Sequence, residues 1–495
     1  MIKNKYKSFY ILLSLLIAVQ VIWLIFSPGF YFIDDGCHYV YNRHFYLMTD
    51  MIISSWARLG RVMLYALPAQ TNYRAVQIFA AIIFDLTAIL GFKILELKKI
   101  PHPEWALLTI GFQPVLFNIS YTALAELPTA FLIVLSYYLF IKEKYSGAVI
   151  VSSLVFLFRS EYFFVCGLFV IILLFRKKWY TILLALIGPL LWYLTVLIIS
   201  GSYTEFFRIF TLHNRLPRIS SGIDWYYYII SIPKIFGIIN TLFFLLAIII
   251  LIYKKSIMDW VLPLLIFIGG IAGHTLAALN TFNATCSIGQ IRYVSVVGPM
   301  FGLLSAIGIG YMFNSINKKY LKYFLSIAVI LLLFISGPFM TPFHSKYEID
   351  KICDNITAIR NQNFPDYPVM TDLYQMSVAM DMPYKDYKDF HKMKKSTFKA
   401  LDRVFIIWEY YLDGTPFTDS DLMLRDIESD SSVKMIDSIH VYADHSNDYP
   451  VFKFFRFESK SSKEMMKYLT GEQNAFENTY IKVFVKDRSN ENTVR

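Results

Sequence analysis

Long apolar runs separated by short polar segments occupy the first 340 residues of the chain. A helix of about 20 apolar residues crosses a hydrocarbon core about 30 Å thick. The runs therefore predict a polytopic α-helical membrane protein with about eleven transmembrane helices. The expected helices cover residues 8–27, 73–95, 104–120, 127–141, two halves of 147–175, 180–200, 235–253, 260–279, 294–313 and 323–341.

One apolar run, residues 147–175, is interrupted by Arg159 and Glu161. A single helix of this length would extend roughly 43 Å, and it would place the basic cluster at 176–178 outside, against the positive-inside rule. We therefore expect two short helices that meet below the outer surface. Arg159 and Glu161 then lie at membrane depth, where protein or a water-filled cavity must surround them.

Lysines set the expected orientation, because cytoplasmic loops carry an excess of positive charge. Three lysines, at positions 3, 5 and 7, precede the first run. We therefore expect a cytoplasmic N-terminus and an outer location for residues 28–72. The first run lacks a small-residue cleavage site, so it is expected to remain as an anchor.

The outer segments of the membrane part are rich in arginine rather than lysine. In the first of them, residues 48–67 have an amphipathic pattern with Arg58 and Arg61 on the expected polar face. A guanidinium binds phosphate in a bidentate manner, so these arginines indicate a phosphate-bearing ligand, although some are expected only to reach lipid headgroups. The outer arginines are Arg43, Arg58, Arg61, Arg159, Arg208, Arg215, Arg218 and Arg292.

Beyond residue 342 the composition becomes that of a soluble protein. Strand-like alternation covers 367–371, 404–408, 433–443, 450–457 and 480–485, and helix-like periodicity covers 419–429 and 461–469. Mixed strands and helices predict a small α/β domain. We therefore expect a transmembrane domain, residues 1–342, and an extracytoplasmic α/β domain, residues 343–495.

Composition supports a membrane protein. Charged residues make up 17% of the chain, against about 25% in soluble domains. The net charge of +10 is explained by inner-loop lysines, so it requires no nucleic-acid partner. The four cysteines lack zinc-site spacing and leave open a disulfide between Cys37 and Cys286 or two free thiols. Richness in Ile, Lys, Asn, Phe and Tyr is typical of an AT-rich bacterial genome, and hence of a plasma (inner) membrane.

The most informative polar residues are Asp34 and Asp35, which follow the first apolar run and precede His38. Carboxylates are costly to hold near lipid, so we expect them to have a function. One can act as a general base toward a hydroxyl group while the other orients it. They can also bind a divalent metal, Mg²⁺ or Mn²⁺, although the pattern requires none. The alternative is a solvated loop whose aspartates cap a helix.

Further candidates for substrate binding lie on the same expected side. Arg159 and Glu161 also fit an ion pair between short helices, and His274 fits a hydrogen-bonded interior histidine. Glu126 fits a first-turn acid of a helix, and Arg292 an interfacial anchor. The combination on one side favours a binding site. The candidates are His38, Arg61, Glu126, Arg159, Glu161, His274, Arg292 and Tyr293.

Four motifs, and more weakly a fifth, carry a resemblance to a known family. They are Phe-Ile-Asp-Asp-Gly at 32–36, the amphipathic stretch 48–67, Ala-Glu-Leu-Pro at 125–128, Arg-Ser-Glu at 159–161 and Arg-Tyr at 292–293. With these motifs the chain resembles the GT-C superfamily of integral-membrane glycosyltransferases. The layout is similar to polyprenyl-phosphate-mannose-dependent mannosyltransferases and protein O-mannosyltransferases, although the latter have Asp-Glu in place of Asp-Asp. The Asp-Asp-Gly is also similar to a motif of mycobacterial arabinosyltransferases.

The resemblance implies transfer of a hexose such as mannose, or a pentose, from a polyprenyl-phosphate donor of the undecaprenyl type. The acceptor would be a hydroxyl group of a lipid, glycan or protein on the extracytoplasmic side. It implies a single inverting displacement in which Asp34 or Asp35 deprotonates that hydroxyl. Arg159, Arg292 or another outer arginine would stabilise the departing phosphate, and no cofactor is obligatory.

Two other function classes remain open from the sequence. A transporter or flippase of lipid-linked or anionic substrates would carry repeated halves and midplane charges, and the chain shows no internal repeat. A polysaccharide polymerase or ligase with lipid-pyrophosphate donors would use an outer loop rich in Arg and His, and residues 201–232 fit that description. The early Asp-Asp motif favours the glycosyltransferase over the polymerase or ligase, and the lack of a repeat favours it over the transporter.

Overall fold

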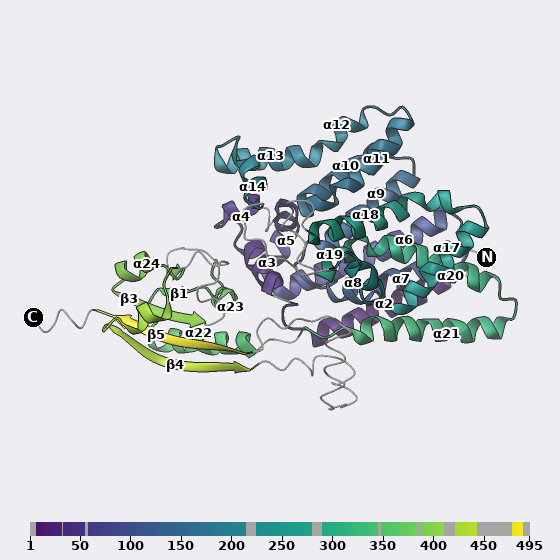
Figure 1. The fold of residues 1–495 in the computed structure, drawn as a ribbon. Coiled ribbons are helices and arrows are strands. Elements are labelled where there is room, and N and C mark those ends of the chain that lie inside the picture. Colours follow the sequence, from purple (N-terminus) through teal and green to yellow (C-terminus); the bar gives the residue numbers. More distant parts are fainter. Residues whose placement is uncertain are drawn as a thin grey trace, which may run out of the picture.

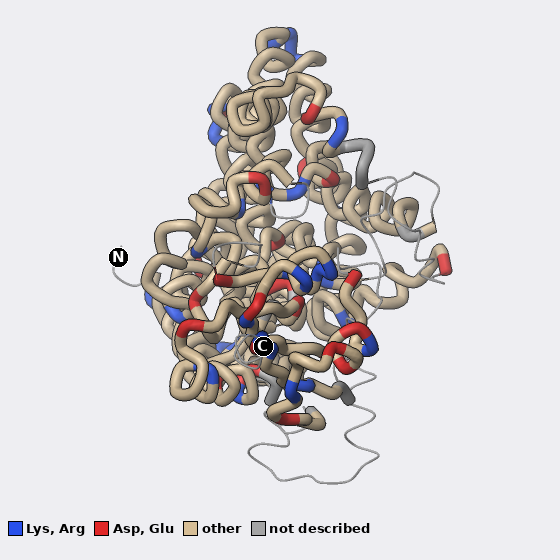
Figure 2. The backbone as a smooth tube through the Cα atoms, turned by 90° about the vertical axis from the view of Figure 1, so that its left-hand side faces the viewer, with Lys and Arg blue, Asp and Glu red and all other residues tan. Residues whose placement is uncertain are grey.

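The computed structural model describes residues 6–31, 33–54, 58–213, 224–279, 290–344, 348–383, 389–409, 421–442 and 478–488. Several predicted features lie outside these residues: the strand 450–457, the helix 461–469, Arg215, Arg218 and Cys286. The helical part, residues 6–344, and the sheet part, residues 348–488, lie side by side (Figure 1). Charged residues are sparse along the helical part and frequent around the sheet part (Figure 2).

The helical part consists of apolar helices of two lengths. Within the described residues, the stretches long and apolar enough to cross a membrane are Lys7–Phe26, Tyr73–Leu97, Ile257–Ala277, Ile291–Asn314 and Lys319–Met340. Shorter apolar helices accompany them, so the chain is a multi-pass membrane protein; the total of about eleven spans stays a prediction. The elements are α2 (Lys7–Phe26), α3 (Ile33–Arg43), α4 (Thr49–Ile53), α5 (Leu59–Thr71), α6 (Tyr73–Leu97), η1 (Pro103–Trp105), α7 (Ala106–Gly111), α8 (Pro114–Asn118), α9 (Glu126–Ile141), α10 (Tyr145–Phe158), η2 (Ser160–Phe163), α11 (Phe164–Phe175), α12 (Thr181–Ala185), α13 (Ile187–Ser200), α14 (Glu205–His213), α15 (Tyr227–Ile230), α16 (Ile232–Phe236), α17 (Ile238–Tyr253), η3 (Ile257–Trp260), α18 (Val261–Ala278), α19 (Ile291–Val294), η4 (Ser295–Val297), α20 (Gly298–Asn314), α21 (Lys319–Ser336) and η5 (Pro338–Met340).

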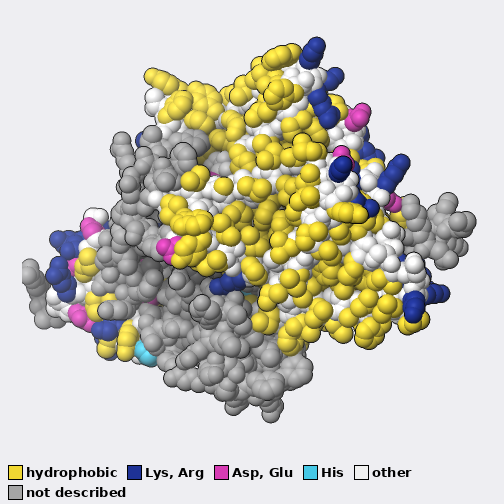
Figure 3. Space-filling model, turned by 45° about the vertical axis from the view of Figure 1, so that its right-hand side comes forward, with side chains coloured by type: hydrophobic (Ala, Val, Ile, Leu, Met, Phe, Trp, Pro, Cys, Tyr) yellow, Lys and Arg dark blue, Asp and Glu magenta, His cyan; other side chains and the backbone are white. Residues whose placement is uncertain are grey.

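Apolar side chains cover a broad face of the helical part (Figure 3). Ile249 of α17 and Ile327 of α21 are among the large apolar residues whose side chains are exposed. Soluble monomers rarely expose apolar patches larger than a few hundred Å², whereas lipid chains solvate such a surface. This face therefore fits contact with lipid. Helix α20, in contrast, is buried along nearly its whole length. Gly308 of α20 allows this helix to approach α17 closely, because a Cβ atom at position 308 would clash with the carbonyl oxygen of Phe243.

The third apolar run is not one continuous helix, so the prediction of a single helix over 104–120 is wrong. Helix α7 ends at Gly111 and α8 begins at Pro114. Proline lacks an N–H group and disfavours helical geometry in the residue before it, and Gln113 has extended backbone angles. At this break the Gln113 side-chain amide joins α7 to α20, donating to the carbonyl oxygens of Thr109 at 2.9 Å and Gly298 at 2.8 Å.

The run 147–175 forms two helices, as predicted. Helix α10 ends at Phe158, Arg159 has extended backbone angles of φ −145° and ψ 92°, and α11 begins at Phe164. The break occurs at the charged residues, because their side chains bind partners on other elements instead of facing lipid.

The acidic motif begins a helix within the expected outer segment 28–72. Asp34 and Asp35 occupy the first turn of α3, where the helix dipole favours negative charge. Helix α5 packs against α3. Just before α5, Arg58 has a φ of 64°, in the left-handed region that non-glycine residues rarely adopt.

The sheet part places helices on both faces of one mixed sheet. The strand order is β2-β1-β3-β5-β4; β1 pairs in parallel with β2 and β3, and β5 pairs antiparallel with β3 and β4. The strand β2 was not predicted, and the helix expected over 419–429 covers only Leu424–Glu428. The elements are α22 (Glu348–Asn363), β1 (Val369–Thr371), α23 (Tyr374–Ala379), β2 (Phe390–His391), α24 (Lys395–Ala400), β3 (Arg403–Glu409), α25 (Leu424–Glu428), β4 (Val433–Tyr442) and β5 (Asn478–Asp487).

Candidate active site

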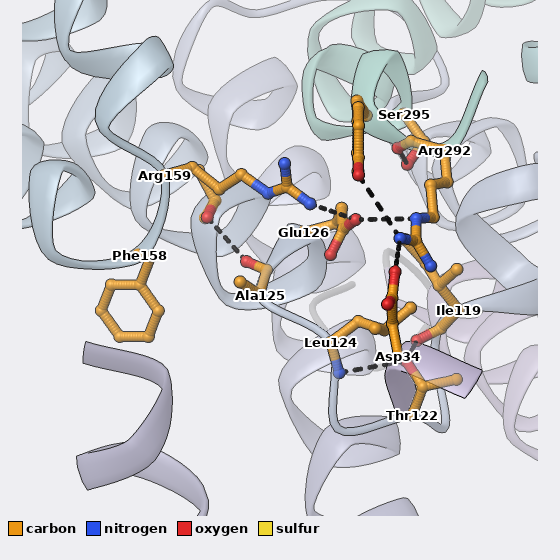
Figure 4. A network of polar contacts seen from close by, with 12 residues as sticks. Asp34, Ile119, Thr122, Leu124, Ala125, Glu126, Phe158, Arg159, Arg292 and Ser295 are labelled. Carbon is orange, nitrogen blue, oxygen red and sulfur yellow. Dashed lines mark hydrogen bonds and ion pairs between the residues drawn. The ribbon is translucent and has the colours of Figure 1, made fainter. Parts of the chain in front are cut away.

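A chain of ion pairs runs from the start of α3 into the helical part (Figure 4). The Nη2 atom of Arg292 pairs with Oδ2 of Asp34, and its Nε lies 3.4 Å from Oε1 of Glu126. The same Glu126 oxygen pairs with Nη2 of Arg159. Arg159 also donates from Nη1 to Oε1 of Glu161 at 2.8 Å. These contacts join residues from α3, α9, η2 and α19.

Arg58 ends the chain of ion pairs. Its Nη1 donates to Oε2 of Glu161 at 2.9 Å and to the carbonyl oxygen of Phe158 at 3.2 Å. We had expected Arg58 on a polar face and had not counted it among the site residues. The excess of arginine over lysine in the outer segments was the signal that could have included it.

The network is balanced in charge and largely shielded from solvent. It joins three guanidinium groups to three carboxylates, and the side chains of Glu126, Arg292 and Arg159 are 1%, 6% and 9% exposed. Buried charges are tolerated only when they are paired. The network therefore requires all of these segments to be packed together.

One oxygen of Glu126 is an exception to this pairing. Its Oε2 atom is buried and has no hydrogen-bond partner among the described residues. A buried acceptor without a donor costs about 1–3 kcal/mol. Figure 4 shows this carboxylate between Arg159 and Arg292, so an unused acceptor lies between two cations.

The two aspartates have different surroundings. Asp35 is fully buried and accepts hydrogen bonds from the backbone N–H of Tyr31 at 2.9 Å, the backbone N–H of Ala123 at 2.7 Å and the hydroxyl group of Tyr73. Burial raises the pKa of Asp35 to about 6, although these hydrogen bonds lower it. Asp34 is 21% exposed and binds Arg292. Asp35 therefore fixes α3 in place, and Asp34 is the carboxylate that a substrate can reach.

Arg61 of α5 binds α3, the helix that carries His38. Arg61 is fully buried, so the prediction that it lies on a polar face is wrong. Its Nη1 donates to the carbonyl oxygen of His38 at 3.1 Å and to Oδ1 of Asn42 at 3.2 Å. Burial lowers the pKa of His38, whose ring is therefore neutral at pH 7.

Tyr293 and His274 lie at increasing distance from the network. The guanidinium of Arg159 lies 4.2 Å from the Tyr293 ring centroid, and that of Arg292 lies 5.2 Å from it. His274 is one step further: its Nε2 is 3.1 Å from the hydroxyl of Tyr162, which donates to the Tyr293 carbonyl at 2.6 Å. The structure thus places His274 as a hydrogen-bonded interior residue, the alternative that the sequence left open.

The two carboxylates of the acidic motif face different partners, namely Arg292 for Asp34 and backbone N–H groups for Asp35. Across the described residues, no three His, Cys, Asp or Glu side chains cluster as metal ligands. Cys37 is a free, buried thiol.

Comparisons with solved structures identify the fold. The chain superposes on the crystal structure of ArnT from Cupriavidus metallidurans bound to undecaprenyl phosphate with a TM-score of 0.54 and 9% identity, over 81% of this chain and 93% of ArnT. The apo state of the same ArnT gives a TM-score of 0.53 and 10% identity, over 80% and 92%. The chain therefore shares the fold of ArnT. No protein-family model and no curated protein matches the sequence.

Proposed function

We propose that this protein is a membrane glycosyltransferase that moves a sugar from a polyprenyl-phosphate donor to an acceptor hydroxyl. The observation that carries the proposal is the ion pair between the partly exposed Asp34 and the buried Arg292. It lies in a fold similar to ArnT, a protein crystallised with undecaprenyl phosphate. In the proposed reaction a hydroxyl group attacks and a phosphate departs. The attack requires a base, and the departure requires a cation beside it.

Asp34 acts as the general base in this proposal. It takes the proton of the acceptor hydroxyl, whose oxygen attacks the anomeric carbon of the sugar. The bond between that carbon and the phosphate oxygen breaks, and polyprenyl phosphate leaves with the bonding electrons. The single displacement inverts the anomeric configuration. Arg292 and Arg159 stabilise the charge that develops on the phosphate, and Oε2 of Glu126 accepts a hydrogen bond from a sugar hydroxyl.

The donor phosphate and Asp34 compete for the same guanidinium. With no donor bound, Arg292 holds Asp34 in an ion pair. A phosphate that binds Arg292 replaces Asp34 as its anionic partner and frees the carboxylate to accept a proton. Donor binding therefore precedes base catalysis.

The remaining parts of the proposal concern topology and specificity. We place the active site, and residues 343–495 as a separate α/β domain, on the extracytoplasmic side of a plasma (inner) membrane, with the N-terminus in the cytoplasm. Mannose or a pentose, and a lipid, glycan or protein acceptor, remain the candidate substrates. If the reaction uses a divalent metal, Mg²⁺ or Mn²⁺, we propose that Asp34 and Asp35 hold it.

The test is transfer of radiolabelled sugar from polyprenyl-phosphate sugars by membranes that contain the wild type, Asp34→Asn or Asp35→Asn. We expect Asp34→Asn to lower transfer by about 10² to 10⁴, the usual contribution of a general base, without loss of folded protein. Asp224→Asn, at an exposed residue, is the matched control and should transfer at the wild-type rate. Equal transfer by Asp34→Asn and the wild type would show that Asp34 is structural and would refute the mechanism.

A further inference from the structure

The three parallel strands of the sheet part form a topological switch point. Helix α23, which follows β1, packs on one face, where its Met376 lies in a cluster with Phe405. Helix α24, which follows β2, packs on the other face, where its Phe398 lies in a cluster with Ile406. The chain therefore leaves β1 in one direction and returns to β3 on its other side. Ligands of open α/β sheets bind outside the carboxyl ends of the strands at such a point.

Charged side chains gather at these carboxyl ends. Asp372 follows β1, Lys392 follows β2, and Glu409 is the last residue of β3. Asp372 and Glu409 are 7% and 4% exposed. The Nζ atom of Lys392 lies 3.9 Å from Oδ1 of Asp372, which also accepts from the backbone N–H of Met393 at 3.4 Å. All three parallel strands are thus followed by or end in a charged residue.

The carboxyl ends of these strands face α3, the helix that carries Asp34. Helix α23, which begins two residues after Asp372, packs against α3 (Figure 1). Arg43, at the end of α3, forms a bidentate ion pair with Asp381 just after α23.

We propose that Asp372, Lys392 and Glu409 bind the acceptor and that this acceptor is a saccharide. The inference rests on the proposed function, because it assigns the second substrate of the same reaction. Carboxylates accept hydrogen bonds from hydroxyl groups and an ammonium group donates them, so the cluster matches neighbouring hydroxyls that do both.

The first test measures binding of the purified full-length protein to an array of immobilised glycans. We expect Lys392→Met and Asp372→Asn to bind the recognised glycans about tenfold more weakly, as expected for loss of one charge-assisted hydrogen bond. Lys399→Met is the matched control. This substitution removes the same charge from an exposed residue near the end of α24, at the amino ends of the parallel strands. The Lys399→Met variant should therefore bind glycans as the wild type does. Lys392→Gln, which keeps a polar side chain, guards against a folding defect in Lys392→Met.

Asp34→Asn separates this inference from the proposed function, because it should lose transfer and retain glycan binding. In transfer assays, the Lys392 and Asp372 variants should raise the acceptor KM about tenfold and leave the donor KM and kcat unchanged. Glycan binding that depends on Lys392 in a protein without transferase activity would support the site and refute the proposed function. A wild type that binds no glycan would overturn the inference, and so would Lys392 and Asp372 variants that bind glycans as the wild type does.

Discussion

Replacing Glu126 by Gln tests whether the buried ion pairs hold the helical part together. The carboxylate lies between Arg159 and Arg292 and is 1% exposed. Coulomb's law at the 3.4 Å separation from Arg292 gives about 5 kcal/mol at an effective dielectric constant of 20. Burial of the charges offsets part of this attraction. Removal of one member of a buried pair nevertheless costs about 3–5 kcal/mol, because the partner charge remains buried.

We therefore expect Glu126→Gln to lower the free energy of unfolding by about 3–5 kcal/mol and the midpoint of thermal unfolding in detergent by roughly 3–5 °C. Glu143→Gln, at an exposed position, is the control and should shift the midpoint by less than about 1 °C. Adding Arg159→Met to Glu126→Gln restores the charge balance, so the double variant should recover part of the lost stability.

Unchanged unfolding of Glu126→Gln would refute the reasoning, because a buried carboxylate between two cations cannot be neutralised without effect if the network is real. Additive losses in the double variant would show that Glu126 and Arg159 do not interact.

Two further predictions concern single residues. The pKa of Asp35 is raised from 3.8 to about 6, so the folded protein binds a proton more tightly than the unfolded chain. This contribution to stability is fully present below pH 3.8 and is lost as the pH rises through 6. Thermal unfolding between about pH 3 and pH 7 should therefore show the wild type losing about 3 kcal/mol relative to Asp35→Asn; parallel pH profiles would contradict it. Gln113→Ala should destabilise the protein by about 1–3 kcal/mol, because the carbonyl oxygens of Thr109 and Gly298 lose a buried donor. Gln70→Ala, at an exposed residue, is the control and should have less effect. Equal midpoints of thermal unfolding for the two variants would show that the hydrogen bonds of Gln113 do not stabilise the break after α7.

Patterns that are local in the chain were readable from the sequence. Apolar runs predicted most of the helices, because hydropathy over about 20 residues decides whether a helix can lie in lipid. The charged interruption at Arg159 predicted the break between α10 and α11 correctly, because an unpaired charge cannot remain in a lipid-facing helix. Pro114 carried a similar signal for the break after α7, and we did not use it.

The sequence by itself determined a multi-pass membrane protein with an acidic motif, outer arginines and a mixed strand-and-helix segment after residue 342. Only the tertiary structure decided how these residues combine. It paired Asp34 with Arg292 across 258 positions of the chain, buried Arg61 behind α3, and gave Asp34 and Asp35, adjacent in sequence, different surroundings. The physical reason is that hydropathy and helix propensity act over a few turns, whereas a buried ion pair depends on which distant segments pack together.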